Sequence, residues 1–199
     1  VFKVDCLGMP PVEPRPRAAD EGVKDHAMVI VASDLYLDRP ETLARLEVLF
    51  GGYEAAGARV MGHGRAARPA AALFTFVLCG DFFSSVDRAS THRSKAEAAF
   101  AALAKLLGRF SALREHSHFV FIPGPSDPSL GSPDVLPRPP LPTFLRAALE
   151  SILSHAHFAG SPAHLDVCGQ QFVVARDELL TRMCRSALLP PNESMTADL

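Results

Sequence analysis

Three short apolar runs divide the first two thirds of the chain, and a polar turn follows each of them. The runs cover residues 27–33 (AMVIVAS), 73–79 (LFTFVLC) and 119–122 (FVFI). Unbroken runs of this length that are rich in Val, Ile and Phe are typical of strands covered on both faces of a sheet. Pro123 ends the third run, and the Pro- and Gly-containing residues after it predict a stiff turn.

Amphipathic patterns occupy the intervals between these runs. Leucines recur at helical spacing after Asp38, and we expect Gly51 and Gly52 to end that helix. Strands that alternate with helices in this way predict an α/β layered fold. The remaining predictions are helices over residues 93–107, 143–153 and 177–188 and two short strands within residues 164–175.

The length and the local composition predict one domain with a polar tail. A chain of 199 residues can bury a sizeable core as a single domain, which we assign to residues 27–188. Within it, residues 55–71 are rich in Ala, Gly and Arg and lack periodicity, so they are predicted to form a low-complexity insertion loop on the surface. Residues 189–199 are predicted to be a polar tail.

The chain carries neither a strong net charge nor a long apolar segment. Its formal net charge is −2 at pH 7 and its pI is about 6.5, so tight autonomous binding to duplex DNA is not expected, because phosphate neutralisation supplies much of that affinity. No run approaches the length of a membrane span, and no signal peptide opens the sequence. The widely spaced cysteines favour buried free thiols over a zinc site; they are Cys6, Cys79, Cys168 and Cys184.

Each apolar run is followed by an aspartate. These residues are Asp34, Asp81 and Asp127. Because the carboxyl ends of parallel strands meet at one edge of a sheet, the three carboxylates could together hold a hard divalent cation. A structural alternative is that they accept backbone N–H bonds and fix the turns that carry them.

The turns after the three runs resemble the motif loops of calcineurin-like metallophosphoesterases, which read D-x-H, G-D-x-x-D and G-N-H-D. Here the first is Asp34-Leu35-Tyr36, and the others are GDFFS at residues 80–84 and GPSD at residues 124–127. A two-metal site needs ligands from several such positions at once. The resemblance therefore implies a layered calcineurin-like sandwich that has lost its metal site. The positions at which an expected ligand is replaced are Tyr36, Ser84, Pro125 and Ser126.

This pattern of loss resembles the non-catalytic B subunits of the eukaryotic replicative DNA polymerases, and within that group the B subunits of DNA polymerase epsilon. The resemblance implies that residues 1–26 are a linker from, or the edge of, an upstream OB-type barrel. It also implies that the phosphoesterase-like domain is incomplete at its C-terminal end. The blocks that carry the resemblance are VFKVDCLGMPPVEP, LFTFVLCGDFFSS, FVFIPGPSDP, LPRPPL and CGQQFVVARDELLTRMCR.

Other residues of these motif loops are interpreted as structural. Phe82 and Phe83 are too apolar for a solvated catalytic rim, so we expect them in the core or against a partner. Arg138, which lies between prolines, is a candidate to pair with an acid across the mouth of the site or on a partner. The motif loops further contain Gly80, Gly124 and Pro128.

None of the eight histidines follows a strand in the D-x-H or G-H-x-H form. His155 and His157 have a spacing that could chelate a metal on a strand, but they follow a predicted helix. Isolated motif matches of this kind are often false. We therefore interpret the histidines as surface or capping residues and predict neither a metal nor a cofactor.

The resemblance implies a scaffold without enzymatic activity. It would bind the cysteine-rich C-terminal region of the catalytic subunit of DNA polymerase epsilon in the nucleus and meet the replicative helicase complex through that assembly. DNA contact would be indirect or weak, and no membrane contact is expected. Two alternatives stay open. A metal-dependent phosphoesterase or nuclease would use Asp34, Asp81 and Asp127, and a DNA-contacting module would use the arginines of the 55–71 loop.

Overall fold

The computed structural model describes residues 28–62, 74–84, 93–128, 136–167, 169–177 and 183–184. Several predictions fall outside these described residues. They are the linker over residues 1–26, the part of the insertion loop after residue 62, most of the helix over residues 177–188, and the tail over residues 189–199.

A four-stranded parallel sheet forms the centre of the fold. Its strands are β1 (Met28–Ala32), β2 (Phe74–Cys79), β3 (His118–Ile122) and β4 (Ala156–Phe158), and they lie side by side in the order of the chain. β2 is buried along its whole length and β3 nearly so, whereas β1 is a partly exposed edge strand. The α/β fold class predicted from the alternating pattern is confirmed.

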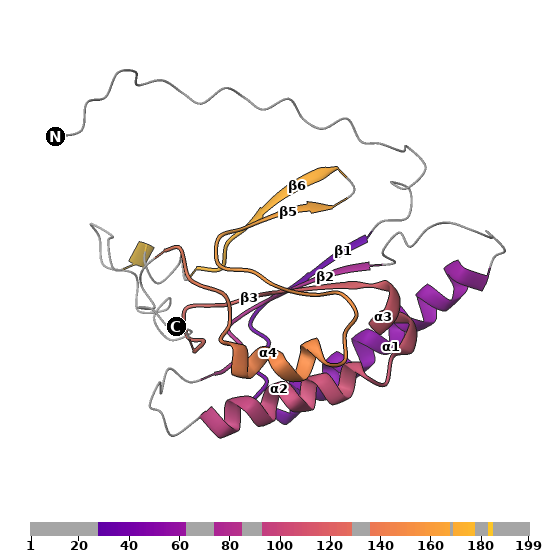
Figure 1. The fold of residues 1–199 in the computed structure, drawn as a ribbon, viewed down its shortest axis with the longest axis horizontal. Coiled ribbons are helices and arrows are strands. Elements are labelled where there is room, and N and C mark those ends of the chain that lie inside the picture. The colour runs from indigo at the N-terminus through magenta and orange to yellow at the C-terminus, as the bar shows by residue number, and fades with distance from the viewer. Residues whose placement is uncertain are drawn as a thin grey trace, which may run out of the picture.

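The four helices α1 to α4 of the described residues lie on one face of this sheet (Figure 1). A connection between neighbouring parallel strands is almost always right-handed, so strands added in one direction place every connecting helix on the same side. The helix predicted over residues 93–107 is found with those bounds. The helices are α1 (Pro40–Gly62), α2 (Arg93–Leu107), α3 (Ser111–His116) and α4 (Thr143–Glu150).

An antiparallel hairpin covers part of the opposite face of the sheet (Figure 1). It consists of β5 (Ala163–Val167) and β6 (Gln170–Val174), as the sequence predicts for residues 164–175. The hairpin contributes to a small second apolar cluster with alternate residues of β2 and β3. The buried members of this cluster are Val77, Cys79, Val120, Ile122 and Ala163.

Aromatic rings fill the larger core between the sheet and the helices. Phe76 of β2 and Phe119 of β3 stack with ring centroids 4.9 Å apart, and Phe50 of α1 packs edge-on against Phe76 at 5.5 Å. All three side chains are fully buried. Offset and edge-on pairs of this kind add to the free energy gained by removing the rings from water. This core holds the sheet rigid beneath the loops at its carboxyl edge.

The prediction that a helix ends at Gly51 and Gly52 is wrong, and so is the loop predicted for residues 55–62. Helix α1 continues to Gly62. Tyr53 packs edge-on against rings of β2, and the Glu54 carboxylate accepts the backbone N–H groups of α3 at 3.0 Å. These tertiary contacts outweigh the cost of about 1 kcal/mol that each glycine brings to a helix interior.

Two short elements were not predicted. Helix α3 contains six residues and β4 contains three, so neither is long enough to show a periodic pattern. His157 does follow a helix, α4, as predicted, but it lies on the unpredicted strand β4. Helix α4 ends at Glu150, slightly before the predicted end at residue 153.

Cys79 is a buried free thiol, as predicted, and burial raises its pKa to about 11. Cys184 is also free and is half-buried, while Cys6 and Cys168 lie outside the described residues. Among the described helices, none combines the length and apolar character needed to cross a membrane.

Candidate functional site

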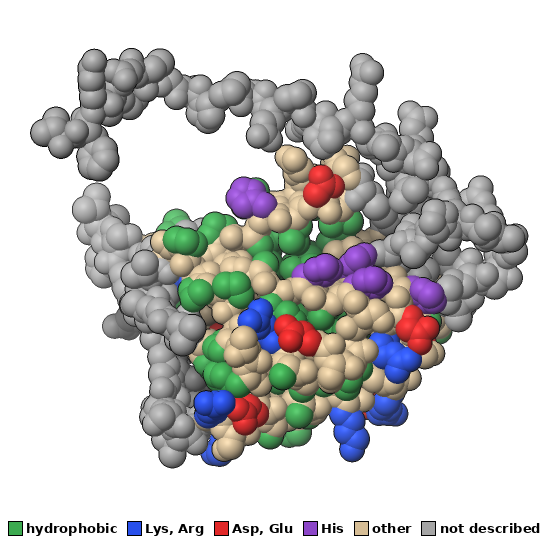
Figure 2. Space-filling view, in the orientation of Figure 1, with side chains coloured by type: hydrophobic (Ala, Val, Ile, Leu, Met, Phe, Trp, Pro, Cys, Tyr) green, Lys and Arg blue, Asp and Glu red, His purple; other side chains and the backbone are tan. Residues whose placement is uncertain are grey.

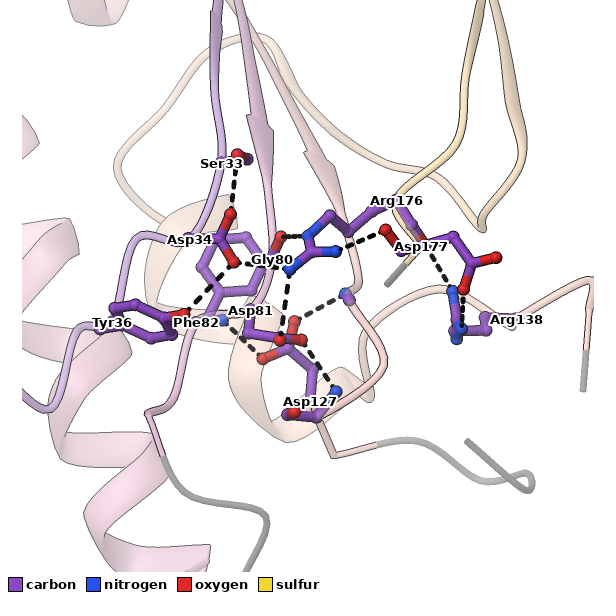
Figure 3. A network of polar contacts seen from close by, with 12 residues as sticks. Ser33, Asp34, Tyr36, Gly80, Asp81, Phe82, Asp127, Arg138, Arg176 and Asp177 are labelled. Carbon is purple, nitrogen blue, oxygen red and sulfur yellow. Dashed lines mark hydrogen bonds and ion pairs between the residues drawn. The ribbon is translucent and has the colours of Figure 1, made fainter. Parts of the chain in front are cut away.

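The structure brings the predicted aspartates to the carboxyl edge of the sheet (Figure 3). Asp34 follows β1, Asp81 follows β2 and Asp127 lies in the turn after β3. Asp81 and Asp127 are each only 3% exposed, while Asp34 is half-buried. In α/β folds this edge is where ligands and metals usually bind.

Asp34 adopts a left-handed backbone conformation with φ of 57°, which aspartate tolerates better than most residues. Its carboxylate accepts hydrogen bonds from Ser33 Oγ at 2.9 Å and from Arg176 Nη2 at 2.6 Å. Burial alone would raise the pKa of Asp34, but these hydrogen bonds and the charge of Arg176 outweigh it and hold the pKa below its ordinary value. Asp34 is therefore an ionised partner of an arginine.

Tyr36 stands where the phosphoesterase motif has a histidine. Its hydroxyl lies 3.4 Å from Asp34 Oδ1, so it makes at most a long hydrogen bond to the carboxylate. Burial, followed by the negative charges of Asp34 and Asp81, raises the pKa of Tyr36. A protonated phenol that donates toward a carboxylate is a poor substitute for a neutral imidazole ligand.

Asp81 and Asp127 hold two neighbouring loops together. Asp127 accepts the backbone N–H groups of Phe82 at 2.6 Å and Gly124 at 2.8 Å. Asp81 accepts the backbone N–H of Ser126 at 2.8 Å. Burial raises the pKa of Asp127 to about 7, although its two backbone hydrogen bonds oppose that rise. The structural role considered for these acids is thus present in the molecule.

Two motif glycines allow this close approach. A Cβ atom at Gly80 would overlap the Asp127 carboxylate and the backbone nitrogen of Gly124. A Cβ atom at Gly124 would overlap the Asp81 carboxylate and the backbone of Gly80 and Asp81. The peptide bond between Gly80 and Asp81 is cis. Glycine is therefore required here for space rather than for chemistry.

The centre of the site is filled by Arg176, which follows β6 (Figure 3). Besides its hydrogen bond to Asp34, Nη2 lies 3.7 Å from Asp81 Oδ2. Nε donates to the Gly80 carbonyl at 3.0 Å, and Nη1 donates to the Asp177 carbonyl at 2.8 Å. A guanidinium therefore occupies the space between two of the three carboxylates.

Arg138 contacts the backbone of Arg176 and the side chain of Asp177. Its side chain is 2% exposed; Nη1 donates to the Arg176 carbonyl at 2.6 Å, and Nη2 lies 3.6 Å from Asp177 Oδ1. Arg138 therefore pairs with an acid of its own chain, Asp177, which adjoins Arg176. Backbone hydrogen bonds between Arg138 and Ser161 fix this position.

The remaining motif residues are structural where the structure describes their contacts. Ser84 donates hydrogen bonds from its backbone N–H and its hydroxyl to the exposed carboxylate of Asp38. The acid that it contacts is therefore not one of the three aspartates at the strand ends. Phe82 is fully buried against Phe100, and Phe83 is half-buried against the same ring. Both phenylalanines therefore belong to the core. Pro125 and Pro128 are half-buried residues of the turn that holds Asp127.

Three histidines, His118, His155 and His157, form a separate group on the molecular surface. His118 Nδ1 lies 3.1 Å from His157 Nε2, and the rings of His118 and His155 are 4.8 Å apart. Figure 2 shows several histidine side chains close together, and another that stands apart from them. His118 begins β3, so this group lies at the opposite end of the strand from Asp127. Within the described parts of the chain, no group of three or more His, Cys, Asp or Glu side chains could hold a metal ion.

Arg176 was not predicted as a site residue, because the sequence prediction relied on acids and histidines at the strand ends. The same signal was available for the arginine: an apolar strand, FVV at residues 172–174, is followed by the charged pair Arg176 and Asp177. Several carboxylates at one edge of a sheet stay ionised more easily when a cation lies among them, so a positively charged residue near this edge could have been expected.

Residues 29–198 match the model of a family described as the B subunits of DNA polymerases alpha and epsilon. The chain belongs to this family. DNA polymerase epsilon subunit 2 of Mus musculus is 27% identical over 221 residues, which cover 98% of this chain and 38% of that protein. Among the B subunits of DNA polymerase epsilon, that of Arabidopsis thaliana is 29% identical, and the match covers 100% of this chain and 40% of that protein.

The resemblance drawn from the proline-rich blocks and the altered motifs is confirmed by this family match. A protein of Caenorhabditis elegans named as a probable DNA polymerase epsilon subunit 2 is 30% identical over 87% of this chain. The relatives are named as second or B subunits, which agrees with the prediction that this family member is not an enzyme. The chain spans about two fifths of the length of the mouse and Arabidopsis relatives.

Proposed function

We propose that this chain acts as a non-catalytic accessory subunit of DNA polymerase epsilon in nuclear DNA replication. The observation that carries the proposal is the family match over residues 29–198. The geometry of the sheet edge supports it, because an arginine stands among the acids where a phosphoesterase would need an open metal site. Fold alone does not assign a function, so the altered site matters as much as the fold.

The proposal includes an inactive calcineurin-like fold. The parallel sheet with acids at its carboxyl edge supports this assignment, as do the replacements Tyr36, Ser84 and Ser126 at expected ligand positions. A phosphoesterase nucleophile is a water activated by one or two metals, and activation requires coordination positions that solvent can reach. Both carboxylate oxygens of Asp127 accept backbone N–H groups. This side chain therefore joins two loops and is not an open metal ligand.

The partner in this proposal is the C-terminal region of the polymerase epsilon catalytic subunit, with the replicative helicase complex reached through the assembly. A rigid fold suits this role, since a preorganised surface loses little conformational entropy on binding. Apolar side chains remain exposed on the edge strand and the hairpin and are candidates for contacts in the buried centre of an interface. They are Met28, Val31, Phe172 and Val173, with exposed fractions of 39–65%.

The test is co-expression of the full chain with the C-terminal region of the catalytic subunit, followed by size-exclusion chromatography and metal analysis. We expect a 1:1 complex and no stoichiometric manganese or zinc on this chain. Val31→Asp and Val173→Asp should each weaken the complex at least tenfold if these surfaces take part. Val48→Asp is the matched control, because Val48 is 77% exposed on α1, away from both surfaces.

Two results would overturn the proposal. One is failure of the folded chain to associate with the catalytic subunit region. The other is stoichiometric metal together with hydrolysis of a phosphodiester such as bis(p-nitrophenyl) phosphate. Loss of binding in the Val48→Asp control as well would show that the effect is not specific to the edge strand and the hairpin.

A further inference from the structure

The guanidinium of Arg176 contacts oxygen atoms from three separate positions at the sheet edge. They are Asp34 Oδ1 at 2.6 Å, the Gly80 carbonyl at 3.0 Å and Asp81 Oδ2 at 3.7 Å (Figure 3). Carboxylate and carbonyl oxygens are the ligands that hard divalent cations prefer. The arginine therefore interacts with a set of atoms whose chemistry suits a metal ion.

Two carboxylates that converge on one point need a positive charge between them, because like charges at short range disfavour ionisation of both. Asp81 is only 3% exposed, so water screens its charge poorly. Arg176 is 16% exposed in its side chain and supplies a permanent positive charge in a planar group that can serve several acceptors at once. An arginine cannot leave the site, whereas a metal ion can dissociate.

We propose that Arg176 is a tethered replacement for a divalent cation, and that this arginine itself closes the sheet edge of this chain to metal ions. Loss of ligands at Tyr36, Ser84 and Ser126 weakens a metal site, but Asp34, Asp81 and the Gly80 carbonyl remain in place around the guanidinium. Removal of the arginine would leave these oxygens facing each other with uncompensated charge. The proposal is independent of the binding partner, so the two tests can fail separately.

The position of Arg176 is fixed by contacts of its backbone as well as its side chain. Its N–H donates to Ser161 Oγ at 3.1 Å, and its carbonyl accepts from Arg138 at 2.6 Å. Through its hydrogen bond to the Gly80 carbonyl, Arg176 therefore links the end of the β5–β6 hairpin to the loop after β2. A metal ion would link only the oxygens of the loops after β1 and β2, whereas this arginine also joins those loops to the β5–β6 hairpin.

The test measures Mn²⁺ binding to the full chain, using the electron paramagnetic resonance signal of free Mn²⁺. The wild-type chain should bind no Mn²⁺ at this edge up to about 1 mM. Arg176→Ala should bind about one equivalent with a dissociation constant on the order of 0.1–1 mM, as found for weak oxygen-ligand sites. The double variant Arg176→Ala/Asp34→Asn should bind at least tenfold more weakly.

Arg109→Ala is the matched control, since Arg109 also pairs with an acid, Glu47, at 2.6 Å but on an exposed surface. It should behave as the wild type. If Arg176→Ala is too unstable to titrate, its melting temperature should rise by about 3 °C in 5 mM Mn²⁺, as ligand linkage predicts, while that of the wild type should not. Binding of Mn²⁺ by the wild type at Asp34, or no binding and no stabilisation of Arg176→Ala, would overturn the proposal.

Discussion

Asp81 and Asp127 each accept a backbone N–H group from the loop that carries the other. The Ser126 N–H donates to Asp81 at 2.8 Å, and the Phe82 N–H donates to Asp127 at 2.6 Å. Both acids are almost fully buried, so losing either carboxylate would leave a buried N–H without an acceptor. This exchange gives these acids a structural role that does not depend on a metal.

Glycine at position 124 is predicted to be essential for this exchange. Gly124→Ala would place a methyl group onto the Asp81 carboxylate and the Gly80 backbone, and we expect a loss of about 1–3 kcal/mol in the free energy of unfolding. Urea denaturation measures the change. Gly52→Ala is the control, because nothing lies within 4 Å of its added methyl group in α1, and it should stabilise the chain by about 0.5–1 kcal/mol. Equal stabilities of the two variants would contradict the packing described for the loops.

Asp127 is predicted to make stability depend on pH between about 4 and 7. Its pKa is raised to about 7 in the folded chain from an ordinary value of 3.8, so in this range the folded state binds the proton more strongly. Its contribution is fully present below about pH 4 and is lost as the pH rises to about 7, with a slope on the order of 1 kcal/mol per pH unit. The stability difference between wild type and Asp127→Asn, measured in urea at several pH values, should shrink over this window. A difference that does not vary with pH would show that Asp127 is ionised throughout.

Arg138 is predicted to contribute more to stability than an exposed arginine with a similar ion pair. Arg138→Met would remove the buried hydrogen bond to the Arg176 carbonyl and the ion pair with Asp177, at a cost of about 2–3 kcal/mol. Arg109→Met is the control and should cost at most about 1 kcal/mol, since its pair with Glu47 is largely solvated. Chemical denaturation of both variants compares them directly. Similar losses would mean that the buried arginine contributes no more to stability than the exposed one.

His118 is predicted to make the chain sensitive to mild acid. Burial, and then the nearby charges of His155 and His157, lower the pKa of His118 below its ordinary value of 6.5. The unfolded chain therefore takes up this proton first, and stability falls as the pH drops below about 6.5. In addition, a hydrogen bond between two imidazoles requires one nitrogen without a proton, so double protonation breaks the contact at 3.1 Å.

His118→Gln should therefore reduce the loss of stability between pH 7.5 and pH 5.5, as measured by urea denaturation at the two pH values. His164→Gln is the control, because His164 is exposed on β5 in the hairpin. A wild-type chain that is equally stable at both pH values would contradict the prediction.

Features encoded by local pattern could be predicted from the sequence, and features that depend on tertiary contacts could not. The first three strands of the sheet and the helix over residues 93–107 follow from runs and periodicity, and the convergence of Asp34, Asp81 and Asp127 follows from parallel strand order. The continuation of α1 past Gly52 depends on Tyr53 and Glu54, whose partners lie far away in the sequence. Local propensity favours a stop there, and packing overrides it.

The tethered arginine shows the same limit at the site itself. Arg176 and Asp34 are 142 residues apart, and no spacing rule connects them. The motifs show which metal ligands are absent. That Arg176 lies between Asp34 and Asp81 depends on the position of the end of β6 next to the loops after β1 and β2, which no local pattern encodes. A family comparison confirms the kind of protein, but only the geometry identifies the group that balances the charge.

The order of the strands has a consequence for how the chain folds during synthesis. Each of β2, β3 and β4 pairs with the strand that precedes it, so the sheet can grow from one edge as residues leave the ribosome. Contacts between neighbours in sequence also shorten the loops that folding must close. The contact between Arg176 and Asp34 instead joins the end of the hairpin to the end of the first strand. We expect this closure to come last, so that in a nascent chain that has not yet reached Arg176 the carboxylates of Asp34 and Asp81 lack this positive charge.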